Sequence, residues 1–396
     1  MPPRALGSTL LTGLVVLTAA SCNSYKNERA VTPNRVTSEA AEQLVSSARA
    51  PASDPAPTPN AEMQAVLDAH AALGPKPIES LSPVEARRQP SPVDAVVQIL
   101  QDRGELAPEP KPVLARVATR EIPGHDGARI AARVYTPNGT GPFPVVVYFH
   151  GGGWVIGSLD LYDASCRALA DRARAVVVSV DYRQAPEHKF PTAHEDAYAA
   201  LQHVLQNAAD FDGDPARVAV AGESAGGNLA TATCRMAKDR KGRMPVHQLL
   251  IYPVTDYAFD TASYLANAEA RPLNRAMMKW FFGQYLNSPA DGLNRLVSPL
   301  RSTTEELRGL PPATVITAEI DPLRSEGMAY AMKLEASQVS VNTRDFQGVT
   351  HEFFGMGAVL EDALEAQEFA AERLVRAFRG ERTALVLTHG MRGQSP

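Results

Sequence analysis

A serine flanked by glycines is the residue in this chain best suited to carry out chemistry. It lies in the run Gly222-Glu223-Ser224-Ala225-Gly226, which follows the apolar segment 218–221 and precedes a helix-forming stretch. The pattern G-x-S-x-G is typical of a sharp strand-to-helix turn that exposes a nucleophilic serine. A serine hydroxyl is a good nucleophile only when it is unhindered and hydrogen-bonded to a base. The spacing therefore predicts that Ser224 attacks an acyl carbon.

A glycine run upstream predicts donors for the oxyanion that such an attack creates. The run H-G-G-G begins at His150, directly after the apolar segment 144–149. Glycine allows the backbone to approach a substrate closely and to turn its N–H groups outward. We expect Gly151, Gly152 and Ala225 to donate to the oxyanion, and one such donor typically lowers the barrier by about 3–4 kcal/mol. His150 itself is expected to support the loop by hydrogen bonding.

The general base should be a histidine that follows Ser224, because the chain order for this type of turn is serine, acid, histidine. Three histidines lie downstream: His247, His351 and His389. The first opens an apolar strand and the last lies in a weakly patterned tail. His351 follows a predicted strand, 339–346, and a predicted loop, 347–350, so it is the expected base.

The acid should lie at the end of another strand. The apolar segment 313–318 is followed by Glu319, Ile320 and Asp321. Asp321 is favoured by its position at the start of the next loop, and Glu319 remains the alternative. The chosen carboxylate would orient His351, which would take the proton of Ser224.

Strand-like and helix-like segments alternate from 113 to 378, and this alternation predicts one α/β domain. Eight strands are expected, the first two near 114–122 and 129–135. These two predict an antiparallel entry to a mostly parallel sheet with helices on both faces. Hydrophobic residues make up 44% of the 396 residues, enough for a large core.

The motifs together resemble the bacterial hormone-sensitive-lipase-like esterases, also called family IV lipolytic enzymes. The resemblance covers roughly residues 66–379. It rests on five stretches: His150–Trp154, Asp181–Glu187, Gly222–Leu229, Asp321–Leu323 and His351–Phe353.

This resemblance implies the α/β-hydrolase fold, ester hydrolysis without a cofactor, and a triad of Ser224, Asp321 and His351. It supports Asp321 against Glu319, and it implies the same oxyanion donors as above. Glu223 is a departure, because the family usually has Asp or Thr there. The ion pairing beside the nucleophile is therefore open.

The family has a cap, and two segments are expected to form one here: residues 61–106 and the insertion 257–296. The core domain is expected to run to residue 380, with a flexible tail at 381–396. The insertion contains an apolar, aromatic helix-like stretch. Pockets for small molecules are mostly apolar, so the residues expected to line the acyl pocket are Trp154, Met277, Trp280 and Phe281. Simple packing on the core is the alternative for these side chains.

Composition and spacing exclude several other classes of function. The formal net charge is −5 and no basic patch is present, so nucleic-acid binding is not indicated. Acidic and histidine residues cluster between 187 and 196, but their spacing matches no zinc signature. We interpret that cluster as a solvated helix face, and we expect no metal. The oligomeric state and the natural ester are not predicted.

The N-terminus has the pattern of a targeting segment. Arg4 precedes an apolar stretch that ends in small residues before Cys22. This resembles a bacterial lipobox, so 1–21 is expected to be a lipoprotein-type signal peptide, and 22–60 a disordered tether. The predicted location is the cell envelope, with a lipid anchor on Cys22. An ordinary secretory signal, leaving a periplasmic or secreted protein, is the alternative.

The sequence thus predicts a serine ester hydrolase that acts through an acyl-enzyme on small to medium, short-acyl esters. An amidase or an acyltransferase with the same triad is one alternative. A ligand-binding protein that has lost catalysis is another, and the presence of all three triad residues argues against it.

Overall fold

Eight strands form one sheet in the computed structural model, which describes residues 57–107 and 111–381. Their order across the sheet is β1-β2-β4-β3-β5-β6-β7-β8. β1 is antiparallel to β2 and β2 to β4, and the other neighbouring pairs are parallel. The predicted α/β-hydrolase sheet with an antiparallel entry is confirmed. The strands are β1 (Arg116–Pro123), β2 (Arg129–Thr136), β3 (Phe143–Phe149), β4 (Val176–Val180), β5 (Gly213–Glu223), β6 (Gln248–Ile251), β7 (Ala313–Ile320) and β8 (Val341–Thr350).

The central strands are apolar throughout because both of their faces are buried. Along β3, Val145, Val147 and Phe149 pack into one hydrophobic core, whereas Val146 and Tyr148 pack into the other. This alternation follows from the two-residue period of a strand. β1, at the edge of the sheet, is mostly exposed and carries charged side chains, which discourage pairing with another chain.

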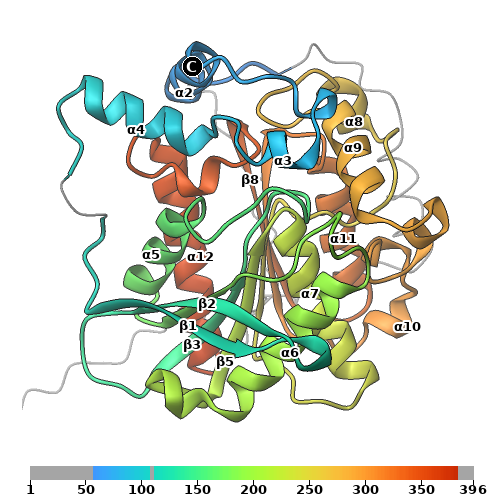
Figure 1. The fold of residues 1–396 in the computed structure, drawn as a ribbon. Helices are drawn as coiled ribbons and strands as arrows, with labels where there is room; N and C mark the ends of the chain where they lie inside the picture. The colour runs from blue at the N-terminus through green and yellow to red at the C-terminus, as the bar shows by residue number, and fades with distance from the viewer. Residues whose placement is uncertain (1–56, 108–110, 382–396) are drawn as a thin grey trace, which may run out of the picture. The chain divides into compact units, whose positions relative to one another are not determined.

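Helices cover both faces of the sheet (Figure 1). α5 (Asp163–Arg172) and α12 (Glu361–Phe378) pack on one face, and α6 (Thr192–Gln206), α7 (Ala225–Asp239) and α11 (Arg324–Ala336) on the other. Cys166 in α5 and Cys234 in α7 are buried free thiols that belong to opposite cores. They therefore act as small apolar packing residues and do not pair.

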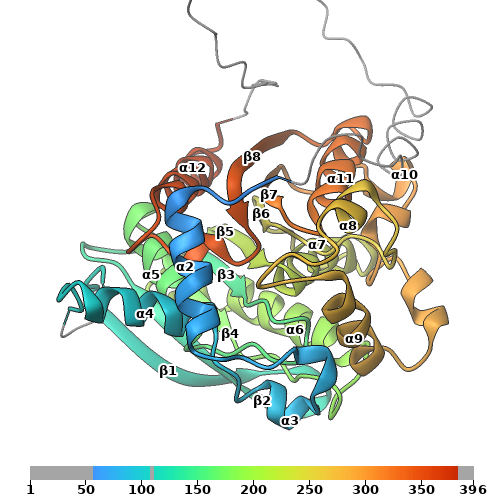
Figure 2. The same ribbon diagram turned by 90° about the horizontal axis from the view of Figure 1, so that it is seen from above.

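Two separate segments lie over the carboxyl-terminal edge of the sheet (Figure 2). The first contains α2 (Ala61–Ala72), α3 (Pro83–Ala86) and α4 (Pro92–Asp102), and the second contains α8 (Ala262–Ala266) and α9 (Arg275–Tyr285). The N–H of Asn60 donates to the carbonyl of Gly348 in β8, at 2.8 Å. The indole N–H of Trp280 donates to the carbonyl of Leu81, at 3.2 Å, and so joins the two segments. A further short helix, α10 (Thr304–Leu307), precedes β7.

The predicted signal peptide, the predicted tether up to residue 56 and the tail from residue 382 lie outside the described residues. None of the helices in the described part of the chain is long and apolar enough to cross a bilayer.

Candidate active site

Ser224 lies at the turn between β5 and α7, with backbone angles of φ 56° and ψ −118°. A positive φ is strained for a residue with a side chain, and such strain is typical of functional sites. Only glycine fits two positions before Ser224 and two positions after it. A Cβ on Gly222 would lie 2.1 Å from the carbonyl oxygen of Gly226, and one on Gly226 would lie 1.9 Å from that of Phe149. The glycines of the motif therefore permit the turn.

His351 and Asp321 complete a hydrogen-bonded chain that ends at this serine. The Nε2 atom of His351 lies 2.9 Å from the Oγ of Ser224, and its Nδ1 lies 2.6 Å from the Oδ2 of Asp321. A carboxylate only accepts, so Nδ1 carries the proton and Nε2 is free to accept one from serine. The N–H of Leu323 donates to Oδ1 of Asp321 at 2.8 Å and holds the carboxylate in place.

Glu319, the alternative acid, has a different partner. Its carboxylate accepts a hydrogen bond from the N–H of Gly348 at 2.7 Å. This contact lies where the pairing of β7 and β8 shifts register after Ala318. The predicted loop at 347–350 was wrong, because β8 continues to Thr350 and delivers His351 directly from its end. The structure therefore joins Asp321, and not Glu319, to the histidine.

The electrostatic surroundings favour a positive charge on His351. Burial alone would lower the pKa of the imidazole, but the charge and hydrogen bond of Asp321, followed by the charges of Glu352 and Glu223, raise it above its ordinary value. A histidine with a raised pKa is a stronger proton acceptor and a more stable cation. This is what the general base of an attacking serine requires.

The glycine run after β3 packs against the nucleophile turn. A Cβ on Gly151 would lie 3.1 Å from the carbonyl oxygen of Glu223, and one on Gly152 would lie 2.4 Å from the backbone of Gly157. Gly152 also has a φ of 90°, which side chains rarely adopt. Ala225 is the first residue of α7, and the first N–H groups of a helix have no partner inside it. The N–H groups of the glycine run and the N–H of Ala225 at the start of α7 can therefore face the same position, where the oxyanion would form.

His150 supports this loop from inside the protein. Its ring is fully buried and stacks on Tyr182 with centroids 4.4 Å apart, and its Nδ1 lies 2.9 Å from the carbonyl oxygen of Gly151. Tyr182 also donates its hydroxyl hydrogen to the carbonyl of His150, at 2.8 Å. These contacts fix the position at which the glycine run begins.

The expected pocket residues occupy two different environments. Phe281 lies against Gly153, where an added Cβ would come within 2.2 Å of the phenyl ring, and Trp280 packs edge-on against Phe281. Met277 is half-buried in the same helix, α9. Trp154 differs, because it is fully buried and stacks on Tyr285 with centroids 4.2 Å apart. Trp154 therefore packs against α9, where Phe282 and Tyr285 contact its ring, and its place in the pocket wall stays a prediction.

The cluster between residues 187 and 196 is a solvated face only in part: Glu187 and His188 are exposed, but two other members are not. His194 and Asp196 are fully buried. Asp196 forms a bidentate ion pair with Arg183, and His194 bonds to Tyr285 and Asn228. Burial lowers the pKa of His194 to about 4, so it is neutral at physiological pH. The described residues contain no group of three or more side chains that could hold a metal ion.

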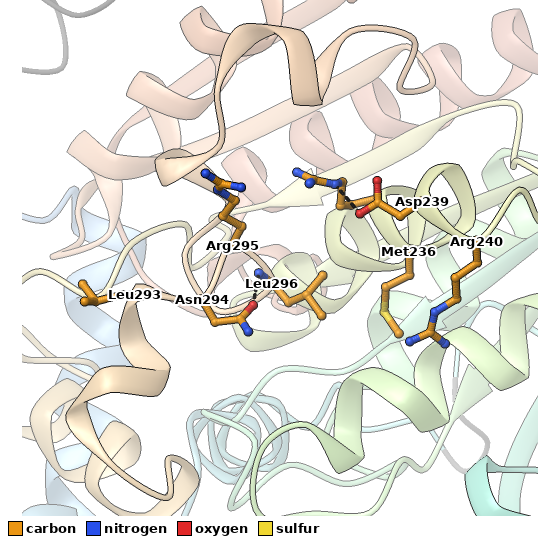
Figure 3. A pocket seen from close by; sticks show the side chains of 8 residues that line it. Met236, Asp239, Arg240, Leu293, Asn294, Arg295 and Leu296 are labelled. Carbon is orange, nitrogen blue, oxygen red and sulfur yellow. Dashed lines mark hydrogen bonds and ion pairs between the residues drawn. The ribbon is translucent and has the colours of Figure 1, made fainter.

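A polar hollow of about 440 Å³ lies at the far end of α7 (Figure 3). α7 has 15 residues and separates it from Ser224 by roughly 20 Å. Its three arginines each pair with a carboxylate: Arg235 with Asp239, Arg240 with Glu195, and Arg295 with Glu306. The pairing leaves no unbalanced charge for an anionic ligand.

Comparison with known proteins places this geometry in a family. A family profile described as the alpha/beta hydrolase fold matches residues 146–355. The chain is 42% identical to carboxylesterase NlhH of Mycobacterium tuberculosis over 276 residues, which is 69% of this chain and 85% of that protein. The chain belongs to the hormone-sensitive-lipase-like esterases of the α/β-hydrolase family.

Two further relatives agree with this assignment. An ethyl acetate hydrolase of Pseudomonas putida is 35% identical over 302 residues, covering 75% of this esterase and 91% of that protein. The crystal structure of a thermostable esterase from Pseudomonas putida has a TM-score of 0.73 and 38% identity, covering 82% of this chain and 99% of that one. The esterase is therefore an α/β hydrolase over most of its length.

Part of the site is not predicted by the sequence. Glu223 stands out there only as a departure from the family pattern, and the tyrosines around that carboxylate and the position of Glu352 are not evident. One signal was present: Tyr148 interrupts the valine run of β3 on the face that also carries Ala221 and Tyr252. A polar tip at a fully buried strand position needs a partner.

Proposed function

We propose that the protein hydrolyses carboxylic esters through an acyl-enzyme formed on Ser224. One observation carries the proposal: the continuous chain of hydrogen bonds from Ser224 through His351 to Asp321, with distances of 2.9 and 2.6 Å. An oriented base next to a strained, glycine-flanked serine is the arrangement that activates a hydroxyl for acyl transfer.

In acylation, His351 takes the hydroxyl proton at Nε2 while Oγ of Ser224 attacks the carbonyl carbon. The negative charge on the carbonyl oxygen is received by the N–H groups of Gly151, Gly152 and Ala225. Asp321 keeps the imidazole in the required tautomer and stabilises its cation. The tetrahedral adduct then collapses: the ester C–O bond breaks, and the imidazolium gives its proton to the departing oxygen, which leaves as the alcohol. In deacylation, a water molecule takes the place of the alcohol and the same groups act in the same order.

The substrate is a small to medium ester with a short acyl chain. Phe281 lies against Gly153 at the oxyanion loop, and Met277 and Trp280 extend the apolar surface along α9. Ser224 itself is buried, with 4% of its surface exposed. One relative is an ethyl acetate hydrolase, which agrees with a short acyl group.

A panel of chromogenic esters of increasing acyl length tests this proposal. Wild type should hydrolyse the short esters fastest, and Ser224→Ala should lose nearly all turnover. An anilide of the same acyl group distinguishes an amidase, and an added acceptor alcohol distinguishes an acyltransferase. Tight binding of esters without turnover would instead support the non-catalytic alternative.

We also propose that the protein is exported and held at the cell envelope by a lipid on Cys22. The support is the sequence pattern: Arg4, an apolar stretch, small residues before Cys22 and an Ala/Pro/Ser-rich segment after it. Each buried methylene of an anchor contributes about 0.8 kcal/mol, so several acyl chains hold a protein firmly to a bilayer.

A further inference from the structure

A second carboxylate lies directly behind the nucleophile. Glu223 is the last residue of β5 and its side chain is buried, with 1% exposed. The hydroxyls of Tyr148 and Tyr252 each donate a short hydrogen bond to one of its oxygens. An acid that is fully buried in an apolar sheet is costly unless it is hydrogen-bonded, so its retention next to Ser224 requires an explanation.

Tyr252 connects this carboxylate to the catalytic histidine. Its ring contacts the imidazole of His351, with centroids 4.6 Å apart, while its hydroxyl bonds to Glu223. The residue is itself held in an uncommon conformation, with φ 34°, by a hydrogen bond from its N–H to the carbonyl of Ile316. The strained backbone at the end of β6 therefore fixes the tyrosine between the two groups.

A further acid completes the arrangement from the other side. Glu352 follows His351 in the chain with φ 71°, and accepts a hydrogen bond from the hydroxyl of Tyr162 at 2.8 Å. The same hydroxyl lies 2.4 Å from the position of a Cβ on Gly151. The hydroxyl of Tyr162 thus fills the space beside the oxyanion loop and holds the half-buried carboxylate of Glu352 there.

We propose that Glu223 is a positioning residue of the reaction, which stabilises the imidazolium that forms on His351 when Ser224 loses its proton. The proposal rests on the ester hydrolysis proposed above. Glu223 touches neither the substrate nor the reacting atoms; it acts through its negative charge and through the Tyr252 ring that it holds against the imidazole. A charge in a low-dielectric interior acts over a longer range than one in water.

The pKa of Glu223 lies near neutral pH. Burial, and then the charge of Glu352, raise the pKa of Glu223 to about 7, and the hydrogen bonds from Tyr148, Tyr252 and Ser165 partly offset this rise. Formation of an imidazolium nearby favours the charged carboxylate, so the two ionisations support each other. The titratable groups that face Glu223 from the surrounding elements are Tyr148, Tyr162, Cys166, Tyr252, His351 and Glu352.

The test is the pH profile of kcat/KM for hydrolysis of p-nitrophenyl butyrate by the full-length chain in detergent. The reaction is followed at a wavelength where absorbance does not depend on pH. The acidic limb of this profile reports the protonation of the free enzyme's base. Glu223→Gln keeps the size of the side chain and removes its charge. The acidic limb should move to lower pH by about 0.5–1 unit, and kcat should fall by about 3–30-fold.

Two matched variants separate charge from structure. Glu223→Asp restores the charge and should return the limb toward its wild-type position. Glu335→Gln is the control. It removes a half-buried carboxylate near the end of the 13-residue helix α11, and the opposite end of that helix is the one near Asp321. This variant should leave the acidic limb at its wild-type pH. A limb that stays at the wild-type pH in Glu223→Gln would overturn the proposal, even if kcat fell, because only a structural role would then remain.

If Glu223→Gln does not fold, Tyr252→Phe provides the measurement. It keeps the ring against His351 and removes one hydrogen bond to the carboxylate, so Glu223 ionises less readily. The limb should move in the same direction by a smaller amount, and an unmoved limb would overturn the inference. Ser224→Ala separates the two levels of the account: if it hydrolyses the ester as fast as wild type, the proposed function itself fails and the inference fails with it.

Discussion

The Nε2 atom of His351 lies 2.9 Å from the Oγ of Ser224, although 127 positions separate the two residues in the chain. The distance is set by two strands of one sheet, β5 and β8, which have β6 and β7 between them. β5 ends directly before Ser224, and β8 ends directly before His351. Because the carboxyl ends of parallel strands meet at one edge, the nucleophile and its base are delivered by rigid elements and not by long loops.

The assignment of the acid predicts a clear ranking of two variants. Asp321→Asn should lower kcat by about 10⁴-fold, because the amide no longer holds the imidazole in the tautomer that accepts the serine proton. Glu319→Gln should cost at most about tenfold, since its amide oxygen can still accept from the N–H of Gly348. Steady-state kinetics on one short ester measures both. A larger loss in Glu319→Gln than in Asp321→Asn would contradict the assignment.

The nucleophile turn predicts different effects of alanine at two helical glycines. Gly226→Ala would bring a Cβ within 1.9 Å of the carbonyl of Phe149, a backbone atom that cannot move freely, so it should destabilise the protein by about 2–4 kcal/mol. Gly283, in the last turn of α9, has open space around it, and Gly283→Ala should stabilise by about 0.5–1 kcal/mol. Urea unfolding with matched m-values compares them. Equal stabilities of the two variants would show that the turn tolerates a side chain.

The buried carboxyl of Glu223 predicts how stability changes with pH. The pKa of this carboxyl is raised from 4.5 to about 7 in the folded protein. Between these two pH values the folded state keeps a proton that the unfolded state has released. The stabilising contribution is therefore complete below about pH 4.5 and is lost as the pH rises through about 7, by up to roughly 3 kcal/mol. The Tm of Glu223→Gln relative to wild type should accordingly increase between pH 5 and pH 8. A relative Tm that is constant or falls over this interval would contradict the buried position of the charge.

The proposed anchor predicts the fate of a single cysteine variant. After expression in a bacterial host, the wild-type chain should fractionate with membranes and incorporate a labelled fatty acid. Cys22→Ser removes the thiol that would carry the lipid, so it should incorporate no label. Cys166→Ser is a matched control, because that thiol is buried in α5. A wild-type chain found unlabelled in the periplasm or the medium would leave only the ordinary secretory alternative.

Local patterns predicted most of the fold and the reacting groups, because each depends on residues close together in the chain. The apolar runs of β3, β4 and β7 identified buried parallel strands, and the glycines around Ser224 identified the turn. The preference for Asp321 over Glu319 followed from its place after the strand, and the hydrogen bond to His351 agrees with it.

What the sequence did not predict depends on contacts between distant segments. Trp154 lies next to the glycine run in the chain, yet its ring stacks on Tyr285, which lies 131 positions further on in α9. The charged appearance of 187–196 concealed a buried ion pair, since Arg183 belongs to a different segment from Asp196. The bonds from Tyr148 and Tyr252 to Glu223 join β3, β5 and the residue after β6, and no spacing rule within one segment reveals them.

Covalent labelling of the nucleophile tests the central claim most directly. An organophosphate ester should add to the protein in one-to-one stoichiometry, and peptide mass spectrometry should locate the phosphoryl group on Ser224, within the segment 222–227. The reaction should be slower in Asp321→Asn and absent in Ser224→Ala, in parallel with the loss of ester hydrolysis. Stoichiometric labelling at any other residue, with hydrolysis retained in Ser224→Ala, would contradict the account.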